Sequence, residues 1–213
     1  SSSSDQKQGE YNYVLVAVGM QGNVDGMGLE ELGVEVEKGF IKIDDHMTTN
    51  VSGIYAIGDV TGKTLLAHVA SAQGHIVAEA IAGRDTVALN YENMPRATYC
   101  QPQVASLGLT EAQAVAQGHQ IKVGRFPFRA NGKALGIGEP EGMVKIVADA
   151  QYGDIVGAHL IGHEVTEMLA ELSLAKTLEA TPLEIGNTVH AHPTLSEVLK
   201  EAALDVDNEA IHM

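Results

Sequence analysis

A histidine and an acid with the spacing of a proton-transfer pair lie near the end of the chain, in the stretch His190-Ala-His-Pro-Thr-Leu-Ser-Glu197. Glu197 follows His192 by five residues, so its carboxylate can reach back to the imidazole. A carboxylate partner holds an imidazole in one tautomer and raises its basicity, and such a histidine can accept and return a proton near neutral pH. The stretch therefore predicts His192 as a general acid/base that Glu197 orients.

Two structural interpretations of the same stretch stay open. Thr194 and Glu197 have the spacing of a capping box, which would start a helix at Thr194 and give Glu197 a structural task. His190 and His192 form a His-x-His pair that could supply half of a metal site, but the spacing of the sequence offers no third and fourth ligand, so we expect no metal. The bond before Pro193 can be cis or trans, and the sequence does not decide which.

A second stretch that could bind a ligand reads Gly58-Asp-Val-Thr-Gly-Lys-Thr64, between a strand-like and a helix-like segment. Its last three residues are those of a phosphate-binding loop, but that loop has four residues between its glycines, and only three separate Gly58 from Gly62. A carboxylate such as Asp59 can instead accept hydrogen bonds from a sugar-like hydroxyl, next to the N–H groups that open the following helix. We therefore favour a ligand-binding turn. A nucleoside triphosphate site and a plain surface turn are the alternatives.

The elements around this turn predict an α/β layer. Tyr13–Val18 and Ile54–Ile57 are apolar, β-prone runs typical of strands buried on both faces. Residues 39–44 alternate and predict a short strand. Residues 65–82 have helical periodicity and end before Gly83, a natural helix stop. Strands that lead into a helix in this order are typical of an α/β fold.

The composition of the chain changes over residues 84–96, which are polar and rich in turn-forming residues, and we interpret them as a linker. Beyond it, strand-like segments and a hairpin around Gly153 predict an antiparallel sheet. Thr110 and Gln113 form a capping-box pattern for a short helix. A longer amphipathic helix is predicted over residues 164–180, with these residues on one face: Met168, Leu169, Leu172 and Leu178. Residues 98–213 thus predict an α+β unit.

The composition argues against several classes of partner. The 213 residues carry 13 Lys+Arg against 28 Asp+Glu, a net charge of −15, which repels nucleic acid and anionic membranes. No apolar run is long enough to cross a membrane, and the polar opening residues predict a flexible end. Cys100 is the only cysteine, which fits a reducing, cytoplasmic setting. We expect its side chain to be at least half-buried and without a redox role.

The segments "TNVSGIYAIGDV" and "HAHPTLSE", with "ATYCQPQVASLGLTE" and "AELSLAKTLEATPLEI" between them, carry a resemblance to a known family. From about Tyr11 onward the chain resembles the C-terminal part of the dihydrolipoyl dehydrogenases, which are pyridine nucleotide-disulfide oxidoreductases. The resemblance implies an α/β remnant of the FAD- and NAD-binding domains over residues 1–92. It implies an α+β interface (dimerisation) domain with an antiparallel sheet over residues 93–213.

The resemblance also implies roles for individual residues. His192 would exchange the thiol proton of dihydrolipoamide, and Glu197 would orient it. Asp59 would bind the ribityl chain of FAD, and Gly19 would approach the dinucleotide NAD. The backbone at the start of the following helix would lie along the pyrimidine edge of the flavin, through Leu65, Leu66, Ala67 and His68. The partners implied are a second copy of the chain, whose active site the HPTLSE segment serves, and the lipoyl groups of 2-oxo-acid dehydrogenase complexes.

Several parts of the family pattern are missing from this sequence. It has no Cys-x4-Cys pair to carry electrons and no G-x-G-x-x-G turn for FAD pyrophosphate or for NAD. Gln73 stands where the family usually has an acid, and Met20-Gln-Gly replaces an Arg-containing turn. We therefore expect a fragment that is inactive alone and binds FAD weakly or not at all. The alternative for the isolated chain is a catalytically inert dimerisation module.

Overall fold

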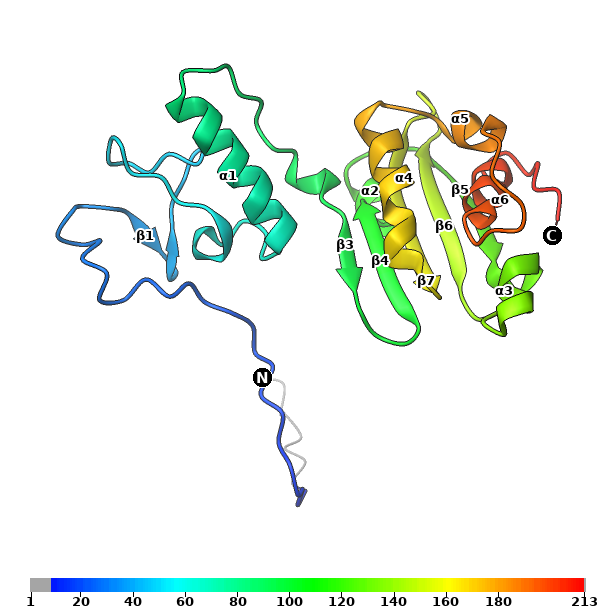
Figure 1. Ribbon diagram of the computed structural model, residues 1–213, viewed down its shortest axis with the longest axis horizontal. Coiled ribbons are helices and arrows are strands. Elements are labelled where there is room, and N and C mark those ends of the chain that lie inside the picture. Colours follow the sequence, from blue (N-terminus) through cyan, green and yellow to red (C-terminus); the bar gives the residue numbers. More distant parts are fainter. Residues whose placement is uncertain (1–8, 213) are drawn as a thin grey trace, which may run out of the picture. The chain divides into compact units, whose positions relative to one another are not determined.

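A computed structural model describes residues 9–212 of the chain. These residues fall into two compact units, which divide between Leu89 and Asn90 (Figure 1). The opening segment that we predicted to be a flexible end lies mostly outside the described residues. The assignment of residues 1–92 and 93–213 to particular domains stays a prediction.

The first unit is small and contains one β-hairpin and one long helix. Its elements are β1 (Val36–Glu37), β2 (Phe40–Ile41), the 3-10 turn η1 (Gly58–Thr61) and α1 (Ala67–Ile81). Lys38 and Gly39 join β1 to β2 with φ values of 52° and 81°, as a tight type I′ hairpin turn requires. A small apolar core lies beneath the hairpin, formed by Val24, Val34, Ile41 and Ala56.

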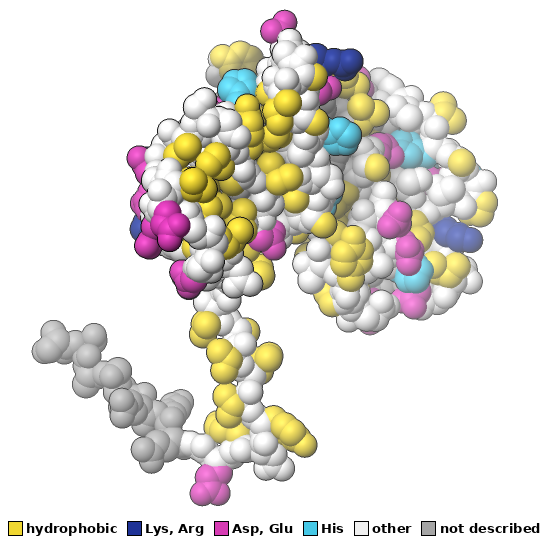
Figure 2. Space-filling view, turned by 60° about the vertical axis from the view of Figure 1, so that its left-hand side comes forward, with side chains coloured by type: hydrophobic (Ala, Val, Ile, Leu, Met, Phe, Trp, Pro, Cys, Tyr) yellow, Lys and Arg dark blue, Asp and Glu magenta, His cyan; other side chains and the backbone are white. Residues whose placement is uncertain are grey.

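The two buried strands predicted for this unit are absent from the described residues. Tyr13 and Leu15 are 93% and 91% exposed, and no described strand pairs with them. Figure 2 shows apolar side chains projecting from this extended segment. In the Ile54–Ile57 run, only Tyr55 makes an isolated bridge, to Thr48. Both predictions were wrong because β-prone residues form a strand only where a neighbouring strand satisfies their backbone groups.

Helix α1 agrees with its prediction in position and in its stop signal. It begins at Ala67 after an extended Leu66, and Gly83 follows its end with φ of 71°. Val69 and Ile76 form its buried side, together with the side chain of Gln73. The spacing of these three residues places them on one helical face, which holds α1 against the rest of the unit.

The second unit is an antiparallel sheet with helices. Its strands are β3 (Arg96–Thr98), β4 (Gln103–Gly108), β5 (Ile121–Pro127), β6 (Met143–Asp149) and β7 (Ile155–Gly162). The helices are α2 (Glu111–Ala116), α3 (Gly132–Ile137), α4 (Val165–Thr177), α5 (Pro182–Asn187) and α6 (Glu197–Asp205), and the 3-10 turns are η2 (Tyr91–Asn93) and η3 (Phe128–Ala130). The strand order is β3-β4-β7-β6-β5, with every neighbour antiparallel.

The main core lies between one face of this sheet and helices α4 and α6 (Figure 1). Val144 and Ile146 of β6 point into it, where they meet Leu172 of α4 and Leu199 of α6. Alternate residues of the same strand point to the other face, and Val147 there joins a second apolar cluster that α2 covers. The α+β unit with an antiparallel sheet is therefore present as predicted.

Helix α6, which begins with the candidate residue Glu197, lies tightly against β5. Gly124 makes this approach possible, because a Cβ atom at that position would lie 2.1 Å from the carbonyl oxygen of Ala202. The carboxylate of Asp205 accepts the backbone N–H of Arg125 at 2.7 Å, and Lys122 donates to Asp207 at 2.6 Å. The sheet therefore fixes the position of α6.

Local helix signals in this unit are mostly confirmed. The capping box of Thr110 and Gln113 is present at the start of α2, and Gly153 sits in the β6–β7 turn with φ of 85°. Leu178 is an exception, because α4 ends at Thr177 and leaves that side chain 69% exposed. The prediction that Cys100 is at least half-buried was also wrong, since its thiol is exposed in the β3–β4 connection.

Candidate active site

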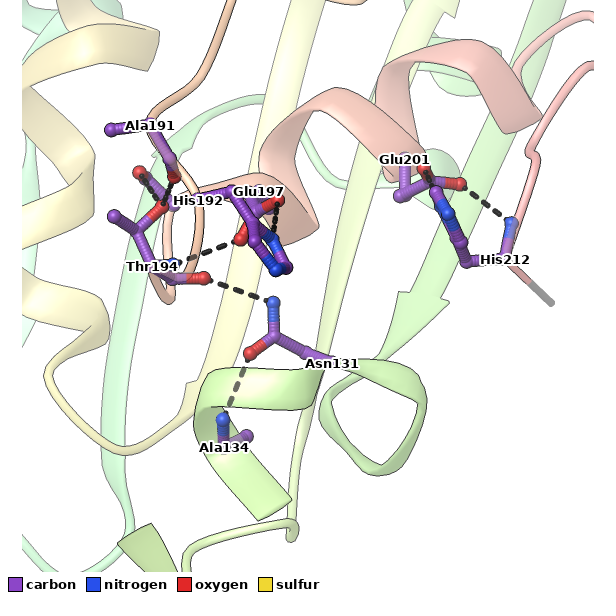
Figure 3. Close-up of polar contacts among 9 residues, drawn as sticks. Asn131, Ala134, Ala191, His192, Thr194, Glu197, Glu201 and His212 are labelled. Atoms are coloured by element: carbon purple, nitrogen blue, oxygen red, sulfur yellow. Dashed lines mark hydrogen bonds and ion pairs between the residues drawn. The ribbon is translucent and has the colours of Figure 1, made fainter. Parts of the chain in front are cut away.

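His192 and Glu197 are in direct contact in the turn that leads into α6 (Figure 3). Nδ1 of His192 lies 2.9 Å from Oε1 of Glu197. A carboxylate oxygen accepts hydrogen bonds, so Nδ1 is the protonated nitrogen of the neutral ring and Nε2 has the free lone pair. The imidazole is 78% exposed, whereas the carboxylate is 27% exposed. The histidine is thus held at one nitrogen and open to a reactant at the other.

Glu197 also has the structural task that its spacing from Thr194 indicated. Its second oxygen, Oε2, accepts the backbone N–H of Thr194 at 2.8 Å, which is half of a capping box. The other half is absent, because Ser196 and not Thr194 is the N-cap of the helix. The Thr194 hydroxyl donates to the carbonyl oxygen of Ala191 at 2.7 Å. The helix starts at Glu197, with Ser196 as its N-cap, so the predicted start at Thr194 was early. One carboxylate therefore fixes both the turn and the imidazole.

The surroundings of Glu197 keep it ionised. Partial burial works to raise the pKa of this carboxyl. The hydrogen bonds from Thr194 N–H and His192, and the positive charge of a protonated histidine, outweigh that effect and hold the pKa below its ordinary value. An anionic partner stabilises the imidazolium that forms when His192 takes up a proton.

The pair lines a pocket of about 240 Å³ beside α6. Asn131 and the chain end at His212 contribute to its wall, as does Lys200. The pocket mixes apolar and polar groups, and the exposed imidazole of His192 belongs to its lining. A small reactant with a transferable proton can therefore approach the Nε2 side of the ring.

His190 lines the same pocket as His192, but its imidazole contacts a different carboxylate. Its Nε2 lies 2.9 Å from Oε1 of Glu171 on α4, and its Nδ1 lies 3.1 Å from the carbonyl oxygen of Thr188. The side chain is 5% exposed. Because the two histidines have different carboxylate partners, the His-x-His metal alternative has no geometric support, and no group of three or more candidate ligands gathers among residues 9–212. The His192–Pro193 bond, left open above, is cis.

Another histidine–carboxylate contact lies on the same pocket, and no pattern in the sequence predicted it. Nδ1 of His212 lies 2.7 Å from Oε1 of Glu201, whose other oxygen accepts the N–H groups of Ile211 and His212. The buried Glu201 thereby ties the C-terminal segment to α6 (Figure 3). A separation of eleven residues across a helix end has no local sequence signature. The signal that the sequence did offer for this contact was the acidic residue Glu201 among the apolar residues on one face of its helix.

The candidate ligand turn in the first unit is the 3-10 turn η1 followed by the start of α1. Gly58 has φ of 74° and its N–H donates to Oε1 of the buried Gln73 at 2.6 Å. Gln73 thus supplies a buried acceptor oxygen to this turn. The side chain of Asp59 is exposed, and α1 begins at Ala67 without a side-chain cap. An exposed carboxylate can accept hydrogen bonds from the hydroxyls of a ligand, and the start of α1 presents the positive end of the helix dipole.

The other residues predicted to bind a cofactor lie in two places. Leu65 and Leu66 are half-buried, whereas Ala67 and His68 are exposed, and all four lie at the junction of η1 and α1. Gly19 is exposed in the extended N-terminal segment, with φ of 106°. Lys63 lies before α1 rather than in its first turn, which differs from the strand–loop–helix arrangement of a phosphate loop.

Two parts of the chain match known protein families. Residues 94–203, just over half of the chain, match the dimerisation domain of the pyridine nucleotide-disulphide oxidoreductases, and residues 2–74 match the pyridine nucleotide-disulphide oxidoreductase domain. The chain belongs to this family of enzymes. It therefore combines a fragment of the nucleotide-binding region with an α+β dimerisation domain. No helix within residues 9–212 has the length and apolar character needed to cross a membrane.

Individual relatives agree with this assignment. The chain is 58% identical over 190 residues to a dihydrolipoyl dehydrogenase of Mycobacterium leprae, covering 88% of this chain and 41% of that protein. It is 54% identical over 203 residues to a dihydrolipoyl dehydrogenase of Corynebacterium glutamicum, covering 93% and 43%. The flavoprotein disulfide reductase RclA of Escherichia coli superposes with a TM-score of 0.82 at 25% identity, covering 88% of this chain and 43% of RclA. The chain thus spans about two fifths of the length of these relatives.

Proposed function

We propose that this chain is the C-terminal part of a dihydrolipoyl dehydrogenase in which His192 is the acid/base for the substrate thiols. The observation that carries the proposal is the 2.9 Å contact between Glu197 and an imidazole that is otherwise open to solvent. The identity to two dihydrolipoyl dehydrogenases over about nine tenths of the chain supports the choice of substrate.

The residues of this chain would act on the proton of the reaction. A thiol of dihydrolipoamide would approach the pocket and attack a disulfide that the whole enzyme supplies, since this sequence has one cysteine. Nε2 of His192 would accept the thiol proton as the new S–S bond forms, the old one breaks and one cysteine leaves as a thiolate. Glu197 keeps Nδ1 protonated and stabilises the imidazolium with its negative charge. When the leaving thiolate needs a proton, His192 returns it. The first step uses the neutral tautomer that the Glu197 contact selects, and the second step restores it from the imidazolium.

FAD and NAD are the cofactors that we propose for the whole enzyme. FAD supplies the relay that passes the electrons of the dithiol to NAD⁺. Asp59 would bind hydroxyls of its ribityl chain, and the backbone from Leu65 to His68 would lie along the flavin ring. Gly19 would approach the nicotinamide dinucleotide. The one cysteine of this sequence cannot form the redox pair, so we expect no turnover from the isolated polypeptide.

A homodimer is the proposed assembly, supported by the match of residues 94–203 to a dimerisation domain. In the dimer, the turn that carries His192 would serve the active site of the second copy, and the substrate would be the lipoyl group of a 2-oxo-acid dehydrogenase complex. The isolated chain would then behave as a dimerisation module without catalysis.

The direct test joins this chain to the N-terminal part of the Corynebacterium glutamicum relative, in place of that protein's own C-terminal part. We expect the chimaera to be yellow and to reduce NAD⁺ with dihydrolipoamide. His192→Gln should lower turnover about 10²–10⁴-fold, the usual contribution of a general acid/base. A flavin-bound His192→Gln chimaera with full turnover would exclude the proposed role. If the isolated chain were yellow and reduced NAD⁺ with dihydrolipoamide, the proposal that it is inactive on its own would be wrong.

A further inference from the structure

We propose that Asn131 is a positioning residue that ties the His192–Glu197 turn to the start of helix α3, an inference that rests on the function proposed for that pair. The side chain of Asn131 is 5% exposed, which is unusual for an amide because buried polar groups need partners for all their strong hydrogen-bonding atoms. It lies on the wall of the same pocket as His192.

The two ends of the Asn131 amide have different partners. Oδ1 accepts the backbone N–H of Ala134 at 2.9 Å and caps α3. Nδ2 donates to the carbonyl oxygen of Thr194 at 3.1 Å. An N–H partner requires the oxygen and a carbonyl partner requires the nitrogen, so these two contacts fix the orientation of the amide. Asn131 therefore bridges α3 and the HPTLSE turn, 63 residues apart (Figure 3).

Thr194 is the residue through which Asn131 would act. Its N–H donates to Oε2 of Glu197, and its hydroxyl donates to the carbonyl oxygen of Ala191 on the other side of His192. A displacement of Thr194 would therefore move the carboxylate that holds the imidazole. Asn131 holds the backbone carbonyl of Thr194 next to the start of α3.

The backbone of Asn131 is anchored to the main core. It directly follows the 3-10 turn η3, and its own N–H donates to the carbonyl oxygen of Phe128 at 2.8 Å. The Phe128 ring is fully buried in the main core. Two hydrogen bonds of Asn131, one to Thr194 and one to Phe128, thus connect the HPTLSE turn to the core of the unit.

Two substitutions of Asn131 remove its hydrogen bond to Thr194 and keep its cap of α3. Asn131→Asp keeps an oxygen for the Ala134 N–H, and aspartate is as good a helix N-cap as asparagine, but it has no N–H for Thr194. Asn131→Ser keeps a capping oxygen without adding charge, and its short side chain does not reach Thr194. Thr110→Ala is the matched control, because it removes the cap of α2 and leaves the HPTLSE turn untouched.

The test measures amide hydrogen exchange and imidazole ¹⁵N shifts by NMR on the full 213-residue chain. In both Asn131 variants we expect the Thr194 amide to exchange at least tenfold faster and the His192 nitrogens to shift toward those of Glu197→Gln. In Thr110→Ala the exchange rate of the Thr194 amide should stay within twofold of the wild type, and the His192 ¹⁵N shifts should not change. If the Thr194 exchange rate and the His192 shifts of a folded Asn131 variant match the wild type, Asn131 is only a helix cap and the proposal is overturned.

Folding failure is also decisive. If the aspartate variant does not fold, the neutral serine variant gives the same two outcomes. If neither folds, Asn131 is required for the unit as a whole, and the specific positioning role is rejected. None of these measurements needs flavin or substrate. Loss of turnover in the His192→Gln chimaera therefore tests the proposed function separately.

Discussion

Glu197 and Glu201 lie one turn apart on α6, and each places a carboxylate oxygen against Nδ1 of a different histidine, at 2.9 and 2.7 Å. Their surroundings differ. Glu201 is 7% exposed and also accepts two backbone N–H groups of the chain end, whereas Glu197 is 27% exposed and borders an open imidazole. One helix face thus carries two similar contacts, of which the first is suited to proton transfer and the second to holding the C-terminus.

Glu197→Gln should lower turnover of the chimaeric enzyme about 10²-fold, at the lower end of what a general acid/base contributes. The glutamine amide keeps the size of the side chain but has no charge to stabilise an imidazolium, and it can present an N–H to Nδ1. Steady-state kinetics with dihydrolipoamide and NAD⁺ measure the effect. Glu184→Gln, which alters a capping box on α5, is the control and should keep full turnover. Equal rates in both variants would show that His192 acts without its carboxylate.

Glu201→Gln should make the stability of the chain less sensitive to acid. Partial burial raises the pKa of Glu201, but the hydrogen bonds from His212 and Ile211 outweigh it, so the folded-state pKa lies below the ordinary 4.5. A depressed carboxyl pKa contributes stability that is complete above 4.5 and is lost as pH falls through the folded value. Thermal unfolding at neutral pH and at about pH 3 measures this difference. The wild type should lose more Tm than the variant, and parallel losses would contradict the assignment.

Glu171→Ala should destabilise the second unit by about 1–3 kcal/mol, the cost of leaving a buried polar atom without a partner. The affected atom is Nε2 of His190, whose side chain is 5% exposed. Urea unfolding measures the change. Glu167→Ala on the same helix replaces an exposed acid and should stay within about 0.5 kcal/mol. Similar midpoints for the two variants would mean that the His190–Glu171 contact contributes nothing.

Asp59→Asn should weaken flavin retention by the chimaera about 10-fold to 100-fold, because a hydrogen bond to a charged group contributes about 1.5–3 kcal/mol. Flavin released on dilution, followed by its absorbance, gives the ratio. Asp25→Asn changes another exposed acid of the same unit and is the control. Unchanged retention in Asp59→Asn would argue against the flavin turn.

The contacts that could be predicted from the sequence, in the site and in the fold, are those between near neighbours in the chain. His192 and Glu197 are five residues apart, and Thr110 and Gln113 are three apart, so spacing alone indicated both contacts. The contact of Asn131 with Thr194 joins residues on different elements, and no local pattern indicates it. Tertiary packing, which brings α3 to the HPTLSE turn, decides such contacts.

In the failed strand predictions a local sequence pattern was present, but the strand that it indicated did not form. Tyr13–Val18 has the apolar, β-prone composition of a buried strand, but composition does not supply a hydrogen-bonding neighbour, and within residues 9–212 the segment has none. The sheet of the second unit was predicted correctly because its strands pair with one another inside the same stretch of chain.

The ¹⁵N spectrum of the neutral His192 ring shows which of its two nitrogens carries the proton. We expect a single tautomer, with the proton on Nδ1 and a bare Nε2, that becomes a mixture in Glu197→Gln. A wild-type ring that already shows the mixture, or that carries its proton on Nε2, would contradict this expectation.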